Sequence, residues 1–241
     1  MAGNLAQVLV RDPDLGSGLD PRRRRSASRD LIAATISAFE GPWNPEQDAE
    51  GVRGGIGLLV LEGLVVRRVG RAGRHGAELL GPGDLMRPWQ NDGEDVTLPV
   101  QTSFRVIEHS VLALLDLRFA ARAAMYPEVV GALVGRAMQR SRTLVFTMAI
   151  AHYPRTDQRL LMLMWHLADR WGRVTPDGVR VPLRLTHELL ADLVASRRPS
   201  VTTALQRLAR DGQVARRGDS WILHGEPPGE LAALGHDARG R

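Results

Sequence analysis

The chain has 241 residues, of which 44% are hydrophobic and 24% are charged, so it can form one large domain or two smaller ones with separate cores. It contains no cysteine, which excludes a disulfide framework, a thiolate-bound iron–sulfur cluster and a cysteine-ligated zinc finger, and fits a reducing cytoplasm. The formal net charge of +5 is too small to establish nucleic-acid binding, so the position of the charges must decide.

The sequence shows no export or membrane pattern. The N-terminus lacks the basic-then-apolar order of a signal peptide, and no apolar run approaches the roughly 20 residues that span a bilayer. We therefore expect a soluble, cytoplasmic protein with no membrane partner.

Residues 1–30 are predicted to be a polar segment that precedes the folded core, with four consecutive arginines at Arg22–Arg25. Such a run can be an arm that contacts DNA or the solvated start of a helix, and the sequence leaves both open. A short amphipathic helix is expected from Ser28 to Phe39, ended by Gly41 and Pro42.

From Gly51 to about Asp116 the sequence changes to short runs rich in valine and leucine, separated by glycines. Such runs are typical of strands joined by tight turns. The predicted strands are Ile56–Val60, Leu64–Val69, Ala77–Leu80, Phe104–Glu108 and Val111–Asp116. The predicted turns are Gly54–Gly55, Glu62–Gly63, Arg71–Gly73 and Gly81–Gly83. Close spacing of short strands predicts a small antiparallel barrel or roll.

A long helix is expected over Glu128–His152, because Pro127 suits a first helical turn and no further proline follows. Apolar or small residues recur along it at alternating spacings of four and three, which is the pattern of a coiled-coil seam. The seam residues are Val130, Val134, Ala137, Ser141, Leu144 and Met148, followed by Ala151. A buried core helix is the alternative. We favour a dimer seam because the other face carries Arg136, Arg140 and Arg142.

Tyr153-Pro154 ends that helix, and a second one is expected over Arg155–Trp171 with Gly172 as its C-cap. Pro176–Gly178 is predicted to be a turn. The following segment, Val179–Leu185, is predicted to be an edge strand, since an edge position tolerates the proline within it.

A helix-turn-helix is predicted between Leu185 and Gly212. Thr186 is a good N-cap for a short first helix that ends near Val194, and the turn is Ala195–Ser196. The second helix starts near Arg197, with a proline tolerated in its first turn. Its inner face consists of Val201, Ala204, Leu205 and Leu208.

The outer face of that second helix carries arginines and short polar side chains but no acidic residue. In a helix-turn-helix the start of the second helix enters the major groove, where arginine can bond guanine and hydroxyl groups can reach phosphates. Two short strands between Gln213 and Leu223 are expected to form a wing with arginines at its tip. The predicted DNA-binding residues are Thr186, Arg197, Arg198, Ser200, Thr202, Thr203, Gln206, Arg207, Arg216 and Arg217.

The local charge supports the same interpretation. Between Arg184 and Leu223 the chain has seven arginines against four acidic residues. An ordinary helical corner is the alternative, but it does not explain why a cap, a small turn residue, an arginine-rich helix and a basic wing occur together. The segment therefore predicts a winged helix-turn-helix that binds double-stranded DNA.

The order of a glycine-punctuated roll, a long seam helix and a winged helix-turn-helix resembles the CRP/FNR family of bacterial transcription regulators. The similarity is strongest over residues 185–223. It is looser from about Gly54, where Gly57–Val66 looks like the family's strand–turn–strand element and Leu80–Leu85 looks like its Gly-Asp turn.

The resemblance implies that Arg198 takes the place of the arginine that reads a guanine. Two positions depart from the family's pattern: Pro199 stands where many members have a base-reading glutamate, and Thr203 where they often have arginine. The operator sequence therefore cannot be carried over.

The effector site departs further from the family. Members that bind cyclic nucleotides follow the Gly-Asp turn with a Gly-Glu pair and an Arg-Ser/Thr-Ala cassette for the cyclic phosphate, and no such cassette follows Asp84 here. Arg87, Trp89 and Gln90 are candidates for a pocket that takes another small-molecule effector. The alternative is that Trp89 plugs the roll and Arg87 faces solvent. No cofactor is expected, and the missing cysteines exclude the redox-sensing branch.

Catalysis is not expected. The seven histidines are scattered, with no pair at metal-ligand spacing on one helix face, and the sequence has no nucleophile elbow, phosphate-binding loop or dinucleotide fingerprint. We expect neither an active site nor a metal site.

The sequence thus predicts an α+β chain in four parts. These are an N-terminal segment with an antiparallel, cyclic-nucleotide-binding-like β-roll (1–120), a dimerisation helix (121–153), a winged helix-turn-helix (154–226) and a flexible tail (227–241). The expected function is sequence-specific regulation of transcription by a homodimer on a pseudo-palindromic operator, with RNA polymerase as a possible further partner. The alternative is a nonspecific or RNA-directed winged-helix protein without an effector.

Overall fold

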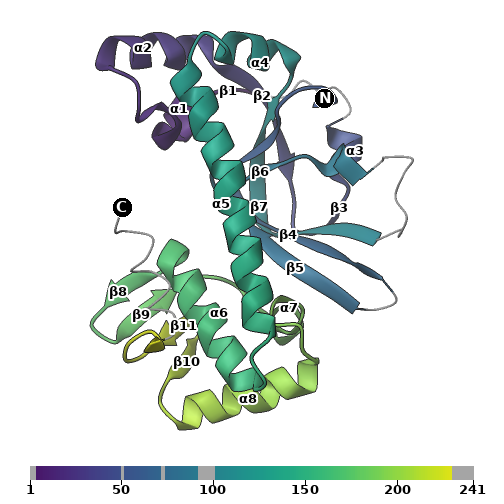
Figure 1. Cartoon of the computed structure of the whole chain (residues 1–241), viewed down its shortest axis with the longest axis vertical. Helices are drawn as coiled ribbons and strands as arrows, with labels where there is room; N and C mark the ends of the chain where they lie inside the picture. The colour runs from purple at the N-terminus through teal and green to yellow at the C-terminus, as the bar shows by residue number, and fades with distance from the viewer. Residues whose placement is uncertain (1–3, 50–51, 72–73, 92–100, 230–241) are drawn as a thin grey trace. The chain divides into compact units, whose positions relative to one another are not determined.

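The structure is a computed structural model that describes residues 4–49, 52–71, 74–91 and 101–229 (Figure 1). The chain divides into two compact units, Met1–Thr143 and Leu144–Arg241. The boundary falls inside the long helix α5 (Pro127–Ala151), whose bounds match the predicted helix to within one residue. The last twelve residues of the predicted tail lie outside the described residues.

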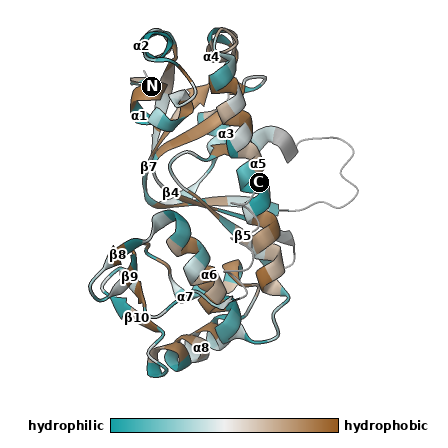
Figure 2. Ribbon diagram, turned by 60° about the vertical axis from the view of Figure 1, so that its left-hand side comes forward, coloured by the Kyte–Doolittle hydropathy of each residue, from teal (hydrophilic) through white to brown (hydrophobic). Residues whose placement is uncertain are grey.

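The first unit is built on an antiparallel sheet, as predicted. Among its described residues, seven strands pair in the order β1-β2-β7-β4-β5, with β3 added to β7 and β6 added to β4. The strands are β1 (Leu5–Gln7), β2 (Ile32–Ala38), β3 (Gly41–Trp43), β4 (Gly57–Arg71), β5 (Arg74–Leu80), β6 (Leu85–Met86) and β7 (Gln101–Leu115). The short helix α3 (Pro45–Asp48) lies between β3 and β4, the 3-10 turn η3 (Pro88–Asn91) lies between β6 and β7, and α4 (Leu117–Ala123) follows β7. The strands carry both apolar and polar residues (Figure 2). Parts of β4 and β7 are buried on both faces, with Leu59 and Ala113 in one core and Leu58 and Leu112 in another.

β4 and β7 are each one long strand where two short strands were predicted. The predicted turn at Glu62–Gly63 is wrong, because the chain bulges there and stays paired with β7, with register shifts on both sides of Glu62. Gly63 permits the bulge. Its φ is +88°, and a Cβ atom at this position would lie 2.3 Å from the carbonyl oxygen of His109.

The predicted helix over Ser28–Phe39 is also wrong. Helix α2 spans Pro21–Asp30, because Asp20 caps it by accepting hydrogen bonds from the backbone N–H groups of Arg22 and Arg23 at 2.8 and 3.0 Å. The residues after it form β2, whose backbone pairs with β7. Pairing with a strand far along the sequence overrides the local helical pattern.

The first 31 residues were predicted to be a polar segment, but part of them belongs to a hydrophobic core. Helix α1 (Val8–Arg11) and the 3-10 turn η1 (Pro13–Gly16) precede α2, and Leu9, Leu15 and Leu31 are buried in one core with Phe119 of α4. A second core lies among the central strands and includes Val60, Val65 and Leu112, with Trp89 packed against it.

One face of α5 is fixed to the first unit. Val129 and Leu133 are buried, and Arg136 and Arg140 are partly buried beside carboxylates, whereas Arg142 is exposed. Arg136 forms an ion pair with Asp12 at 2.9 Å. Arg140 forms one with Glu78 at 2.5 Å and donates a hydrogen bond to the carbonyl of Leu85 at 3.1 Å. Two of the three arginines on the face opposite the predicted seam therefore form ion pairs with acidic residues of the first unit.

The second unit combines three helices with a small sheet. Its helices are α6 (Thr156–Trp171), α7 (His187–Leu193) and α8 (Arg198–Arg210), and its strands are β8 (Arg173–Thr175), β9 (Gly178–Val181), β10 (Val214–Arg217) and β11 (Ser220–Leu223). The strand order is β10-β11-β9-β8, so β9 is a central strand. The predicted edge strand Val179–Leu185 is therefore wrong in position and length. Pairing stops at Pro182, which has no N–H to donate, and the edge is β8.

Gly172 ends α6, as predicted, but through close approach of the backbone and not through a left-handed conformation. Its φ is −69°, and its N–H donates to the carbonyl of Ala168 at 2.8 Å. A Cβ atom at this position would lie 2.3 Å from the same carbonyl oxygen. Only glycine fits without moving the strand that follows.

Glu78 is expected to be the most sensitive charged residue of the first unit. Its side chain is 9% exposed and pairs with both Arg67, at 2.9 Å, and Arg140. Glu78→Gln would leave two partly buried guanidinium groups without their counter-charge, and we expect it to lower the free energy of unfolding by about 2 kcal/mol. Urea unfolding followed by circular dichroism measures this loss.

Glu62→Gln is the matched control, because Glu62 pairs with Arg11 at 2.6 Å on the surface, where its side chain is 58% exposed. The control is expected to cost less than about 1 kcal/mol. Equal effects of the two substitutions would contradict the structural role assigned to Glu78.

Candidate nucleic-acid interface

The second unit contains the predicted helix-turn-helix. The Oγ1 of Thr186 accepts a hydrogen bond from the N–H of Leu189 at 3.1 Å, so Thr186 caps α7 as predicted. The turn closes through the N–H of Ser196, which donates to the carbonyl of Ala191 at 2.9 Å. Ala195 makes this turn with a φ of +49°, a left-handed conformation that costs a non-glycine residue about 1 kcal/mol.

Packing determines which face of α8 is free. The four residues of the predicted inner face are buried, with 0–7% of their surfaces exposed: Val201, Ala204, Leu205 and Leu208. The residues of the predicted outer face are exposed, except for Thr202, which is partly buried: Arg197, Arg198, Ser200, Thr202, Thr203, Gln206 and Arg207. No acidic residue lies between Arg197 and Arg210, so this face presents cations, hydroxyl groups and the amide of Gln206.

The arginines of α8 differ in their partners. Arg207 lies 3.5 Å from Asp157 of α6 and 3.9 Å from Asp211, so part of its charge is already compensated. In the described part of the chain neither Arg197 nor Arg198 forms an ion pair. Arg210 at the far end of α8 also forms no ion pair in the described residues, so the start of the helix carries two of the uncompensated charges, Arg197 and Arg198. The start is the end that enters the groove in a helix-turn-helix.

The predicted wing is the β10–β11 hairpin, with Gly218 at its tip at a φ of +60°. Arg216 packs on the ring of Trp221, 5.5 Å from the ring centre, and its Nε donates to the carbonyl of Gly218 at 3.2 Å. Arg217 forms an ion pair with Asp177 at 2.5 Å. The wing thus holds its two arginines in place, one by stacking and one by charge.

His187 lies on the first helix of the motif, where the sequence suits a DNA-facing position, but it is not among the predicted DNA-binding residues. It is the first residue of α7, and its Nδ1 lies 2.9 Å from the Oγ1 of Thr202 on α8. Burial lowers the pKa of His187, and the nearby guanidinium groups of Arg216 and Arg198 lower it further. The spacing of 15 residues between His187 and Thr202 gave no sign of this contact.

The candidate effector residues lie in the first unit. The guanidinium of Arg87 is 5.9 Å from the ring centre of Trp89. The Arg87 Nε and the Trp89 Nε1 are both buried, and neither has an acceptor among the described residues. The structure does not describe the side chain of Gln90.

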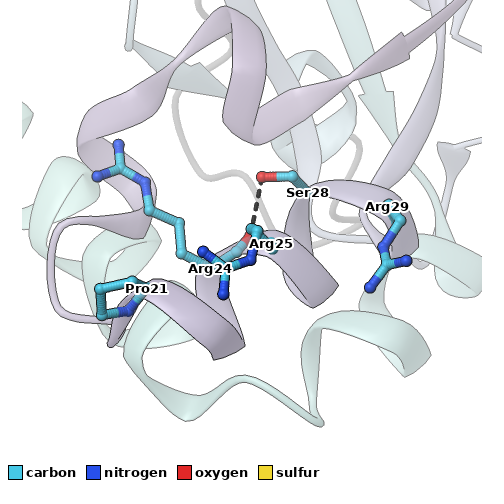
Figure 3. A pocket seen from close by; sticks show the side chains of 5 residues that line it. All are labelled: Pro21, Arg24, Arg25, Ser28 and Arg29. Carbon is cyan, nitrogen blue, oxygen red and sulfur yellow. Dashed lines mark hydrogen bonds between the residues drawn. The ribbon is translucent and has the colours of Figure 1, made fainter.

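The arginine run lies on α2, at the start of a helix. An open groove of about 720 Å³ is lined by Pro21, Arg24, Arg25, Ser28 and Arg29 (Figure 3). The side chain of Arg24 points to one side and donates to the carbonyl of Pro13 at 3.0 Å, while Arg29 points to the other side. These guanidinium groups do not converge on a common point, so the groove does not form a compact anion site.

The described residues contain neither a metal-ligand cluster nor a membrane-spanning helix. No group of three or more histidine, aspartate or glutamate side chains there is placed to hold a metal ion. Within the same residues, every helix is too short or too polar to cross a bilayer.

A sheet unit, a long helix and a winged helix-turn-helix together define the fold of the CRP/FNR transcription regulators. Residues 158–226 match the Crp-like helix-turn-helix domain. No curated protein matches the chain at a significant level. The predicted resemblance to the CRP/FNR family is confirmed by the domain match and by the fold.

The solved structures with the same fold are distant in sequence. A double mutant of CooA from Carboxydothermus hydrogenoformans superposes with a TM-score of 0.63 at 15% identity, covering 86% of this chain and 88% of its own. A CRP-family transcriptional regulator from Thermus thermophilus gives 0.56 at 23% identity, covering 85% and 95%. A cyclic nucleotide-binding domain containing protein from Listeria monocytogenes gives 0.61 at 14% identity, covering 88% and 96%.

Proposed function

We propose that the chain is a sequence-specific transcription regulator that binds a pseudo-palindromic DNA operator as a homodimer. The observation that carries the proposal is the exposed, acid-free start of α8 on a Crp-like helix-turn-helix domain. Arg198 is the candidate for base reading, because it is exposed and without an ion pair in the described residues. Hydroxyl groups of Ser200 and Thr203 and the wing arginines are candidates for backbone contacts. The regulator would act in the cytoplasm, by contact with RNA polymerase or by occluding it.

The exposed face of α5 supports the homodimer. Large apolar side chains recur along it with 36–66% of their surfaces exposed: Val130, Val134, Met138, Val145 and Met148. Spacings of four and three place them on one stripe, together with the small residues Ala137 and Ser141 of the predicted seam. A contiguous apolar stripe is costly in water, and the same stripe of a second copy is self-complementary to it across a two-fold axis.

The first prediction for DNA binding concerns Arg198. Selection of bound fragments from random DNA is expected to return an inverted repeat with half-sites about one helical turn apart. Arg198→Ala is expected to relax the preference at one base position per half-site and to cost about 1–3 kcal/mol on the selected operator, because it removes a bidentate base contact.

Arg217→Ala is the comparison variant, because its position on the wing suits a backbone contact. It is expected to weaken operator and random DNA by similar factors and to reduce the salt dependence of binding. Fluorescence anisotropy measures both variants, at one fixed salt concentration for the sequence preference and over a series of salt concentrations for the salt dependence. Failure to enrich any sequence would favour the alternative, a nonspecific or RNA-directed winged-helix protein.

The second prediction concerns the α5 stripe. A double substitution, Val134→Glu and Met138→Glu, places charges in the proposed seam and is expected to convert the dimer to a monomer in sedimentation velocity. Loss of the dimer is expected to weaken operator binding by at least about tenfold, since the two half-sites would no longer be bound together. Val174→Glu on β8 is the control, because Val174 is 89% exposed and lies off the stripe.

We also propose that the first unit takes a small-molecule effector at Arg87 and Trp89. The two buried N–H donors without acceptors support this, because such groups are normally paired and a ligand with acceptor oxygens would satisfy both. Native mass spectrometry of the purified chain tests it. A small molecule that copurifies with the wild type and is lost in Arg87→Leu would support the site, and two chains free of any such molecule would count against it.

A further inference from the structure

The hydrogen bonds around Thr202 determine which nitrogen of His187 carries the proton. Thr202 has one hydroxyl proton, and its Oγ1 lies 3.1 Å from the carbonyl oxygen of Arg198, to which it donates. The same Oγ1 must then accept the second bond, from Nδ1 of His187 at 2.9 Å. The neutral ring therefore has its proton on Nδ1, and its Nε2 carries a lone pair that can take up another proton.

The charges around His187 are mostly positive. Arg198 faces it from α8 and Arg216 from β10. Glu188 follows it in the first turn of α7. In the described residues no carboxylate forms an ion pair with His187.

This environment keeps the ring neutral in the absence of an anion. Burial and then Arg216 and Arg198 hold the pKa of His187 below its ordinary value of about 6.5, so the free domain is unprotonated here near neutral pH. An anion placed between these groups raises the pKa of His187, because it neutralises both arginines and accepts a hydrogen bond from the protonated ring.

We propose that His187 is a further DNA-contacting residue, which takes a proton from solvent at Nε2 and donates it to a backbone phosphate as the domain binds. The inference rests on the proposed DNA-binding function. The contact with Thr202 keeps the ring fixed against the start of α8, so this phosphate lies beside the bases that Arg198 would read. Phosphate carries no sequence information, so the contact adds affinity on operator and random DNA alike.

The sign of the pH dependence follows from linkage. In the complex the phosphate raises the pKa of His187 above its value in the free domain, so binding takes up a proton at any pH between the two. DNA affinity is then highest and constant below the lower value, falls as pH rises between the two, and is lowest and constant above the higher one. Each unit of difference between the two values corresponds to about a tenfold change in the dissociation constant per protomer.

The experiment measures the dissociation constant of the full chain on its selected operator and on a random duplex, at fixed salt, from about pH 5.5 to about pH 8.5. His187→Asn is the test variant, because an amide N–H can replace Nδ1 in the bond to Thr202 but cannot take up a proton. His224→Asn is the matched control. His224 is an exposed histidine of the same unit, at the end of the β10–β11 hairpin away from the wing tip.

The wild type and His224→Asn are expected to lose affinity as pH rises, by similar factors on both duplexes, while His187→Asn shows a flat profile. Calorimetry in two buffers of different ionisation enthalpy is expected to show proton uptake of up to about one per protomer, lost only in His187→Asn. A pH dependence that persists in His187→Asn, or appears on the operator alone, would overturn the phosphate contact. Binding at every pH with no pH dependence would also overturn it but leave the proposed function intact, whereas absence of DNA binding at every pH would remove the proposed function itself.

Discussion

The orientation of α5 about its own axis depends on two arginines. Arg136 and Arg140 lie one turn apart on the same helix face, and each meets a carboxylate of the first unit, Asp12 and Glu78. Rotating the helix would separate these charges inside a partly buried environment, which costs several kcal/mol. With that face fixed, Val130, Val134 and Met138 on the opposite side of the helix stay exposed. The two ion pairs therefore determine which apolar surface of α5 remains exposed in the first unit.

The same principle orders the helix-turn-helix. Burial of the inner face of α8 fixes its rotation, and contacts to neighbouring elements then restrict the side chains at its edge. Arg207 is held by Asp157, and Thr202 is held between the Arg198 carbonyl and the His187 ring. Arg197 and Arg198 have no such partners in the described residues. Arg207 and Thr202 are thus restricted by contacts within the domain. Arg197 and Arg198 carry charges that an external anion can neutralise.

Local pattern and composition were enough to predict α5, α6, the helix-turn-helix with its Thr186 cap, and the wing. Each depends on signals within a few residues, such as a proline, a cap or a 3.6-residue period. The errors come from long-range pairing. Ile32–Ala38 forms β2 because β7 pairs with it, and the ion pair of Arg136 with Asp12, 124 residues away in the sequence, had no local signal. The contact of His187 with Thr202 was missed for the same reason, since it depends on how two helices cross.

The pattern of compensation also bears on how strongly DNA binding would respond to salt. Phosphates that replace an existing carboxylate partner release fewer counterions than phosphates that meet a free arginine. Two arginines of the candidate interface, Arg207 and Arg217, already have carboxylate partners. The seven arginines between 184 and 223 therefore overestimate the number of phosphates whose neutralisation would release counterions. A histidine that becomes charged only in the complex restores part of this electrostatic term. It does so without adding to the repulsion between Arg198 and Arg216 in the free domain, where a permanently charged side chain at position 187 would destabilise the fold.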